Sequence, residues 1–346
     1  MNLKTIHIED AFSPQIAQKK NLIGEYLLDF DIDYTDRVGI MNGLSGVGLL
    51  LSLFYRNTGN ERYLDKLNQT IVLINEKIYC GKETMVSYCS GIAGYAWLIL
   101  YLKEIDVIEV EIDDYLSDID TVLLHHLKSM IEKKQFDSLH NAVGIGFYFL
   151  KRGRFAIVES IIDGLYGDRI DLYGYLTWSR INTQNNKEII DFGLAHGIPG
   201  TLLFLYKCYL HHVSPAKCSE MIMDNISLML NYINFSGFPS FFPSVIEIDK
   251  LLGYDSSQNV SRLAWCYEDL TALYVLLHLS QSFPIKTDIT NMLENVAQRR
   301  FYAETLVNDA GFCHGASGIA HIFNRLYLQT DNTVFGESRN YWIFQG

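Results

Sequence analysis

The sequence predicts an all-α fold, an α,α-toroid in which a ring of buried inner helices lies inside a ring of charged outer helices. Two observations predict it: a short glycine-containing motif recurs along the chain, and each copy precedes an apolar run that alternates with a charged segment. Proline is scarce, with 6 in 346 residues, as expected of a mostly helical chain because proline disrupts helix interiors.

The repeated motif has six copies. They begin at Asn42, Ser90, Asn141, His196, Tyr267 and His314, and the copy at Tyr267 is degenerate because it lacks glycine. Successive starts are 48, 51, 55, 71 and 47 residues apart, so each step is long enough for two helices and their connections. Six copies in order are hard to obtain by chance, and a repeat of this period indicates a repetitive helical architecture.

The segments between the motifs are of two kinds. Runs such as Ala96–Leu102 and Leu273–Leu279 are too uniformly apolar for a surface helix and are expected to be buried. Segments such as Arg62–Lys77 and Tyr115–Lys134 are amphipathic and charged, as an outer helix would be. An open array would need polar capping repeats, which the sequence lacks, so the alternation favours a closed ring.

The chain is expected to form a single domain over residues 1–346, because no linker divides it. Two stretches read as irregular rather than helical. Residues 165–192 and 234–260 are rich in glycine, aromatic residues and asparagine or proline, a composition typical of loops. We expect them to cover a mouth of the ring.

The composition excludes some classes of protein. With 28 Lys and Arg against 40 Asp and Glu, the net charge is −12, which argues against nucleic acid as a partner. The sequence has neither a signal peptide nor an apolar stretch long enough to insert into a membrane. Its six cysteines are therefore expected to be reduced thiols in a cytoplasmic protein.

Three residues in the last two motif copies form a candidate zinc site. In a closed ring the motif turns meet at one end, so Cys266, Cys313 and His314 would line one cavity. Two thiolates and an imidazole make a ligand set found in catalytic zinc sites, which keep a fourth position open, and soft sulfur ligands favour zinc over magnesium or calcium. The alternative is that each cysteine is a small buried hydrophobic residue.

Four further residues are candidates for the same cavity. His196 lies in a motif turn and titrates near neutral pH, which suits proton transfer, although a lone histidine is more often a packing or capping residue. Arg262 and Tyr267 flank Cys266; alternatively they form a surface ion pair and a core aromatic. Asp137 precedes the third motif by four residues and can equally be a plain helix N-cap.

Three of these motifs carry a resemblance to a known family. They are Ala195-His-Gly-Ile-Pro-Gly, Arg262-Leu-Ala-Trp-Cys-Tyr and Cys313-His-Gly-Ala-Ser-Gly. With them the chain resembles the lanthionine synthetase C-like (LanC-like) proteins, the cyclase family of lanthipeptide biosynthesis, over nearly its whole length. The resemblance implies an α,α-toroid with one zinc ion at its centre, held by Cys266, Cys313 and His314. It also implies that His196, Arg262, Tyr267 and Asp137 surround the metal as catalytic residues.

The chain departs from the family pattern in two motifs. Where the family has Cys-Tyr-Gly with a further glycine three residues later, this chain has Glu268 and Thr271. The third motif has Asn141 and Val143 where glycine and serine are commoner. These changes leave the zinc ligands complete and are expected to alter the shape of the cavity.

The activity that the resemblance implies is a zinc-dependent cyclisation. A cysteine thiol of a dehydrated precursor peptide, made of leader and core, adds to a dehydroalanine or dehydrobutyrine of the same peptide and forms a thioether ring. A dehydratase and an exporter are further implied partners. Three alternatives stay open: a non-catalytic, zinc-stabilised peptide-binding subunit, another zinc thiol-transferase such as a prenyltransferase subunit, and a relative that adds glutathione to dehydrated residues.

Overall fold

The computed structural model describes residues 14–82 and 85–345 of the chain. The chain forms two compact units, an N-terminal unit (residues 1–126) and a C-terminal unit (residues 127–346), and each is described by itself. The expected single domain over residues 1–346 stays a prediction. None of the described helices combines the length and the apolar character that a membrane crossing needs.

Each motif copy directly precedes a helix, as the sequence predicts. These inner helices are α2 (Leu44–Thr58), α4 (Ile92–Glu104), α7 (Ala142–Lys151), α9 (Ile198–Leu210), α11 (Glu268–Leu279) and α14 (Ala316–Thr330). Four of the six have an extended glycine as the residue before the helix, and the other two have Asn141 and Tyr267. The turn geometry therefore survives even where glycine has been replaced.

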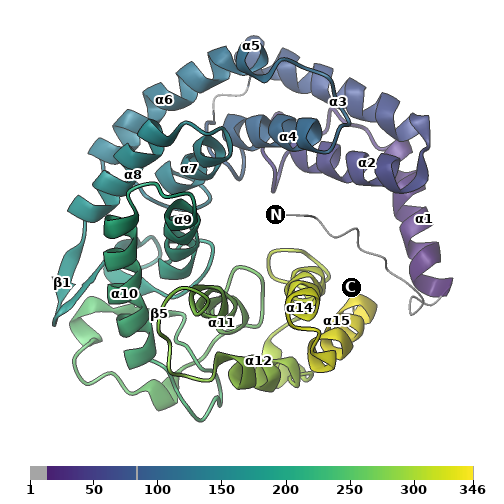
Figure 1. Ribbon diagram of the computed structural model, residues 1–346. Helices are drawn as coiled ribbons and strands as arrows, with labels where there is room; N and C mark the ends of the chain where they lie inside the picture. Colours follow the sequence, from purple (N-terminus) through teal and green to yellow (C-terminus); the bar gives the residue numbers. More distant parts are fainter. Residues whose placement is uncertain (1–13, 83–84, 346) are drawn as a thin grey trace. The chain divides into compact units, whose positions relative to one another are not determined.

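The outer helices follow the inner ones in the chain. They are α3 (Glu61–Tyr79), α6 (Ser117–Glu132), α8 (Phe155–Gly167), α10 (Pro215–Asn231), α12 (Ile289–Ala297) and α15 (Thr333–Gln345). In the C-terminal unit α7 packs on α8, α9 on α10, α11 on α12 and α14 on α15, and Figure 1 shows these helices as side-by-side pairs. Neighbouring inner helices also touch, since α9 contacts both α7 and α11, and α11 contacts α14.

Two short helices and an N-terminal helix complete the helical part. They are α1 (Pro14–Asp29), which packs on α2 and α3, α5 (Ile112–Tyr115) and α13 (Tyr302–Thr305). Burial follows the predicted division of the helices. In α3 the buried positions recur every three or four residues, which is the pattern of a helix with one face in the core, whereas most residues of α4 are buried.

The two irregular stretches contain short strands that the sequence did not predict. A hairpin joins β1 (Ile170–Leu172) to β2 (Tyr175–Thr177), and a second sheet has the order β3 (Arg180–Asn182), β4 (Lys187–Asp191), β5 (Val245–Glu247), all antiparallel. The second stretch also holds the 3-10 turns η1 (Ile248–Lys250) and η2 (Ser256–Gln258). Because β4 pairs with β5, the two stretches are joined to each other, and β4 ends at Asp191 just before the fourth motif.

A buried ion pair fixes the second irregular stretch to an inner helix. Asp269, in the first turn of α11, accepts hydrogen bonds from the backbone N–H groups of Phe241 (3.1 Å) and Phe242 (2.8 Å) and from Arg299 Nη1 (2.6 Å). Arg299 Nη2 also donates to the carbonyl of Gly237 (3.1 Å). Both charged side chains are buried, at 1% and 8% exposure. The start of α11, directly after Cys266 and Tyr267, is thus held in place by buried polar contacts.

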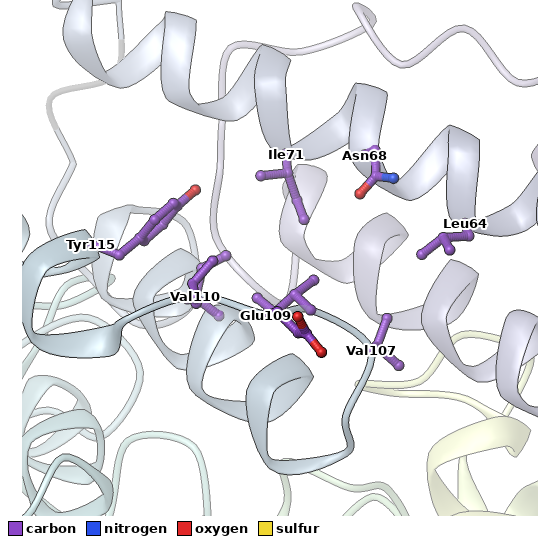
Figure 2. Close-up of a pocket in the computed structure, with 9 residues that line it drawn as sticks. Leu64, Asn68, Ile71, Val107, Glu109, Val110 and Tyr115 are labelled. Carbon is purple, nitrogen blue, oxygen red and sulfur yellow. The ribbon is translucent and has the colours of Figure 1, made fainter.

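The N-terminal unit has an aliphatic cavity of about 330 Å³. Figure 2 shows Leu64 and Ile71 of α3 opposite Val107 and Val110, with Tyr115 at one end. The residues that line it include one carboxylate but no thiol or imidazole. This cavity therefore lacks the thiols and the imidazole of the predicted zinc site.

Candidate functional site

The structure corrects the alignment of the third motif by one residue. Each intact motif has a glycine as the third residue of its helix, namely Gly46, Gly94, Gly144, Gly200 and Gly318. Four residues before these glycines lie Asn42, Ser90, His140, His196 and His314. The third copy therefore begins at His140 and not at Asn141. His140 was not among the predicted site residues because the third copy was taken to begin at Asn141, although the spacing to Gly144 marks His140 as its first residue.

A longer pattern is shared by the fourth and sixth turns. Asp191 and Asp309 each lie five residues before the motif histidine, in the sequence Asp-x-Gly-x-x-His-Gly. Asp191 Oδ1 accepts from the backbone N–H of Gly193 (2.7 Å), and Asp309 Oδ1 accepts from that of Gly311 (2.8 Å). The carboxylates fold the chain back before the histidine, and neither was predicted from the sequence as a site residue.

Two glycines show how tightly these turns are wound. A Cβ atom added at Gly200 would lie 2.2 Å from the carbonyl oxygen of Leu194, and one at Gly318 would lie 1.8 Å from that of Phe312. In both cases the contact is with the backbone six residues earlier, which passes over the first turn of the helix. Only a residue without a side chain fits there, which explains why glycine recurs at this place in the motif.

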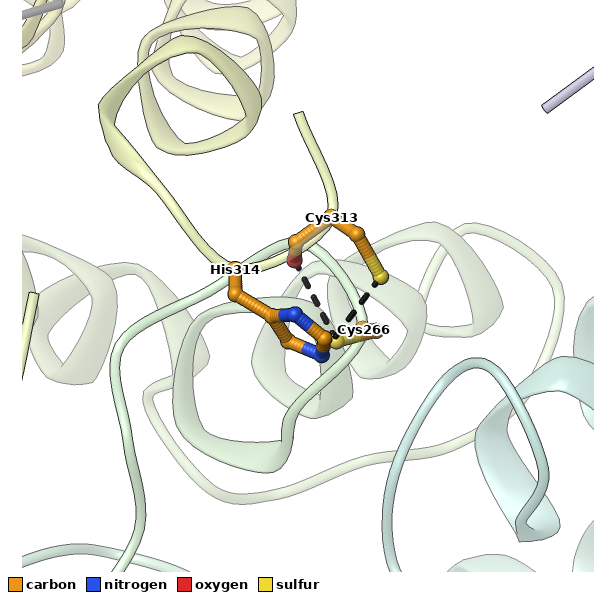
Figure 3. Close-up of side chains that lie close together, drawn as sticks. All are labelled: Cys266, Cys313 and His314. Carbon is orange, nitrogen blue, oxygen red and sulfur yellow. Dashed lines mark hydrogen bonds between the residues drawn. The ribbon is translucent and has the colours of Figure 1, made fainter. Parts of the chain in front are cut away.

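The predicted zinc ligands lie close together in the C-terminal unit. One donor atom each from Cys266, Cys313 and His314 lies within 4.8 Å of the others, and Cys313 Sγ is 3.7 Å from His314 Nε2. Figure 3 shows the three side chains converging, with the Cys266 thiol donating to the Cys313 carbonyl at 3.2 Å. Cys266 is buried, Cys313 half-buried and His314 exposed. Two thiols and an imidazole in this arrangement fit a zinc ion that keeps one position open.

Backbone hydrogen bonds bring the last three turns to one place. The N–H of Ala195 donates to the carbonyl of Cys266 (3.4 Å), and the N–H of Cys266 donates to the carbonyl of Cys313 (3.3 Å). Beneath them Ala195, Ala264 and Cys266 form a small buried cluster to which Leu139 of the third turn also packs. Contacts between neighbouring turns thus hold the site together.

The electrostatic surroundings favour the thiolate of Cys313. A side-chain hydrogen bond between Cys266 and Cys313 lowers the pKa of Cys313 to about 7, with further help from the positive charges of His196 and Arg262. Burial and the carboxylate of Asp309 act in the opposite direction. A thiol with this pKa is ready to bind a metal near neutral pH, because the thiolate is the form that binds.

Asp137 and His196 form a direct pair. His196 Nδ1 lies 2.6 Å from Asp137 Oδ2, and this hydrogen bond raises the pKa of His196. Burial would raise the pKa of Asp137, but the bond to His196 and those from the backbone N–H groups of His140 and Leu139 outweigh it and lower the pKa. The aspartate thus orients the imidazole and stabilises its protonated form.

Arg262 and Tyr267 lie near the predicted zinc ligands. Arg262 Nη2 donates to Asn308 (3.1 Å) and Asp309 (3.0 Å), which ties the fifth turn to the sixth. The Nε atom of Arg262 is buried and has no hydrogen-bond partner among the described residues. The Tyr267 ring lies beside the His314 ring, with centroids 5.4 Å apart. All seven predicted site residues therefore lie at the turns that precede α7, α9, α11 and α14.

The departures from the family pattern lie at these turns as well. Thr271 is buried in the first turn of α11, and its hydroxyl donates to the carbonyl of Tyr267. Asn141 is half-buried at the start of α7, and Val143 is fully buried within it. The side chain of Glu268 lies outside the described part of the structure. Thr271 thus adds a buried side chain next to Tyr267, in the turn that carries Cys266.

Comparison with known proteins places the chain in the predicted family and fold class. The model of the lanthionine synthetase C-like proteins matches residues 35–344. Among solved structures, nisin cyclase is similar with a TM-score of 0.74 and 19% sequence identity, over 95% of this chain and 86% of that chain. These matches confirm the predicted all-α fold of the α,α-toroid class. No curated protein matches the sequence.

Proposed function

The chain belongs to the lanthionine synthetase C-like family, and from this premise we propose that it is a zinc-dependent lanthipeptide cyclase. It adds a cysteine thiol of a dehydrated precursor peptide to a dehydroalanine or dehydrobutyrine of the same peptide and forms a lanthionine or methyllanthionine ring. The observation that carries the proposal is the convergence of Cys266, Cys313 and His314 within 4.8 Å.

Cys266, Cys313 and His314 hold the zinc ion. When bound, zinc supplies the positive charge that lets the substrate thiol lose its proton at neutral pH. The chain prepares the ligands for this role, since the pKa of Cys313 is lowered to about 7. The half-buried and exposed positions of Cys313 and His314 leave the site accessible to a peptide.

His196 supplies the proton that the addition requires. Attack of the sulfur on the β-carbon forms the C–S bond and moves the electron pair of the C=C bond into an enolate, which must then be protonated at the α-carbon. His196 Nδ1 is held by Asp137, so Nε2 is the nitrogen that can deliver the proton. Because its pKa is raised, the imidazole holds this proton at a higher pH than an ordinary histidine does.

Arg262 and Tyr267 stabilise the enolate. The guanidinium of Arg262 is fixed by Asn308 and Asp309 through Nη2, while Nε has no partner among the described residues. A fixed positive charge next to the zinc ligands is suited to stabilising an anionic oxygen of the substrate. The hydroxyl of Tyr267 is a second donor for the same oxygen.

Replacement of His196 tests this assignment. We expect His196→Asn to lower the cyclisation rate of a dehydrated peptide by roughly 10²- to 10⁴-fold, the usual contribution of a general acid, while elemental analysis still finds one zinc per chain. His211→Asn is the matched control because His211 caps the other end of the same helix, α9. Parental rates of thioether formation in His196→Asn would overturn the role of His196.

The alternative is a non-catalytic, zinc-stabilised subunit that binds the precursor peptide and docks a dehydratase or an exporter. The buried Thr271 beside Tyr267, where the family has glycine, favours it. The isolated protein separates the two functions: a cyclase converts the dehydrated peptide by itself, whereas a binding subunit retains the peptide without forming a ring.

A further inference from the structure

A second cluster of metal-ligating side chains lies in the C-terminal unit. Asp137, His140 and His196 each offer one donor atom, and these atoms lie within 4.8 Å of one another. The cluster shares no residue with the Cys266, Cys313 and His314 set. His140 is the member of the cluster that the proposed cyclisation does not use.

The corrected motif alignment explains why these side chains meet. His140 and His196 occupy the same place in the third and fourth motif turns, one before α7 and one before α9. Since α7 and α9 pack against each other, equivalent residues of their turns lie next to each other. The two imidazole rings are nearly parallel, with an interplanar angle of 13° and centroids 5.6 Å apart.

The carboxylate is already fixed between the two histidines. Asp137 Oδ1 accepts from the backbone N–H groups of Leu139 and His140, both at 2.8 Å. Asp137 Oδ2 lies 2.6 Å from His196 Nδ1. The backbone therefore holds the aspartate, and the His140 side chain leaves the same turn that the aspartate organises.

From this geometry we propose that Asp137, His140 and His196 form a second site, for a first-row divalent transition-metal ion such as Zn²⁺. Two imidazoles and one carboxylate are a common three-residue ligand set for such ions. Ligands of a tetrahedral zinc ion are about 3.3 Å apart when each bond is about 2.0 Å. The donor atoms of the cluster all lie within 4.8 Å of one another, and the hydrogen-bonded pair of Asp137 Oδ2 and His196 Nδ1, now 2.6 Å apart, opens to admit the ion. Both histidines are exposed, which leaves room for that movement and for entry of the ion.

Occupation of this site inhibits cyclisation. The nitrogen of His196 that faces Asp137 is Nδ1, so an ion shared with Asp137 binds there and takes the place of the Nδ1 proton. The ring is then no longer an imidazolium, its remaining Nε2 proton is a much weaker acid, and Asp137 no longer accepts a hydrogen bond from it. This consequence rests on the proposed function, since it assumes that His196 is the proton donor. Binding of the second ion does not rest on it, because binding follows from the three side chains alone.

Zinc titration of the full chain tests the site. Protein holding one zinc per chain is dialysed against buffers of increasing free Zn²⁺, and bound zinc is measured by elemental analysis. We expect a second equivalent to bind, and we expect His140→Gln to weaken that step by about tenfold or more without changing the first. His125→Gln is the matched control, because His125 also lies beside another histidine, His126, with centroids 5.6 Å apart.

Binding that stops at one equivalent, or a second equivalent that His140→Gln leaves unchanged, overturns the proposed site. The inhibition is tested separately by the ratio of cyclisation rates with and without the second equivalent. We expect this ratio to fall in the parent protein and in His125→Gln but to stay near one in His140→Gln. A protein that binds two zinc ions and forms no ring contradicts the proposed function and not the second site. A parent rate unaffected by the second ion contradicts the inhibition.

Discussion

The N-terminal and C-terminal units build the same turn and place different side chains on it. In the N-terminal unit the N–H of Met41 donates to the carbonyl of Cys89 (3.0 Å), just as the N–H of Cys266 donates to that of Cys313 (3.3 Å) in the C-terminal unit. At the first position of the intact motifs, two residues before the helix, the first unit has Asn42 and Ser90, whereas the second has His140, His196 and His314. The backbone of the turn is therefore a scaffold, and the chemistry depends on a few side chains.

The units also differ in how they bury charge. In the N-terminal unit Lys77 is buried, but its partners Asp33 and Asp36 are each 67% exposed, at 2.6 and 2.9 Å. In the C-terminal unit both Asp269 and Arg299 are buried. A pair that is completely removed from water depends on both partners, whereas a half-exposed pair can exchange one partner for water.

Replacement of equivalent cysteines in the two units is expected to have the largest effect, on zinc content and on cyclisation. Cys89 and Cys313 occupy the same place in their turns, two residues before the extended glycine. Cys313→Ala removes a zinc ligand, so we expect loss of bound zinc and of cyclisation, whereas Cys89→Ala should keep both. Elemental analysis and a cyclisation assay measure the two outcomes. Full zinc content in Cys313→Ala would contradict the assigned ligand set.

Removal of the buried Asp269 carboxylate should have the next largest effect, on the free energy of unfolding. Asp269→Ala leaves Arg299 as a buried charge without its partner, and we expect the free energy of unfolding to fall by about 3–5 kcal/mol. Lys77→Met is the matched change in the N-terminal unit. It leaves two exposed carboxylates and an apolar chain of similar length, so we expect a loss of about 1 kcal/mol or less.

Urea denaturation followed by circular dichroism compares these two variants with the parent. Equal losses of stability in Asp269→Ala and Lys77→Met would show that full burial of the pair does not distinguish the two units.

The sequence was sufficient for the parts of the molecule that repeat. The six motif turns and the helices after them were predicted because glycine at fixed places and apolar runs leave a pattern that does not depend on distant residues. Cys266 and Cys313 could be singled out among six cysteines as candidate zinc ligands because both lie in motif turns and Cys313 has a histidine beside it, whereas Cys89, in an equivalent turn, has none.

The short strands and the buried ion pair could not be predicted, because they depend on contacts between residues far apart in the sequence. Strands β1 to β5 have three to five residues each, too few for alternation to show in the sequence, and β5 pairs with a strand more than fifty residues away. The buried pair of Asp269 and Arg299 is likewise invisible in the sequence because nothing near either residue indicates the other. His140 was missed for a different reason, since its signal was present and the alignment was off by one.

Glycines in the first turn of two inner helices, one in each unit, allow the stability of the turn to be tested separately from zinc binding. Gly94→Ala and Gly318→Ala each place a Cβ against the backbone, 2.3 Å from the Tyr88 carbonyl and 1.8 Å from the Phe312 carbonyl. We expect each to lower the free energy of unfolding by about 1–3 kcal/mol. Only Gly318→Ala displaces the residue next to Cys313, so only this variant should also lose zinc affinity, as measured by competition with a chelator. Equal zinc affinities in the two variants would contradict this separation.

The pH dependence of cyclisation tests whether His196, paired with Asp137, supplies the proton, and it is the smallest of the expected effects. Because Asp137 raises the pKa of His196, the protonated imidazole persists to higher pH, and the rate should fall only as the pH rises through that raised pKa. Asp137→Asn removes the negative charge, so the alkaline fall in rate should move to lower pH while the zinc content stays the same. Asp163→Asn is the matched control, since Asp163 pairs with Lys217 (2.6 Å) on the surface. An alkaline limb at the same pH in Asp137→Asn and the parent would show that a group other than His196 supplies the proton.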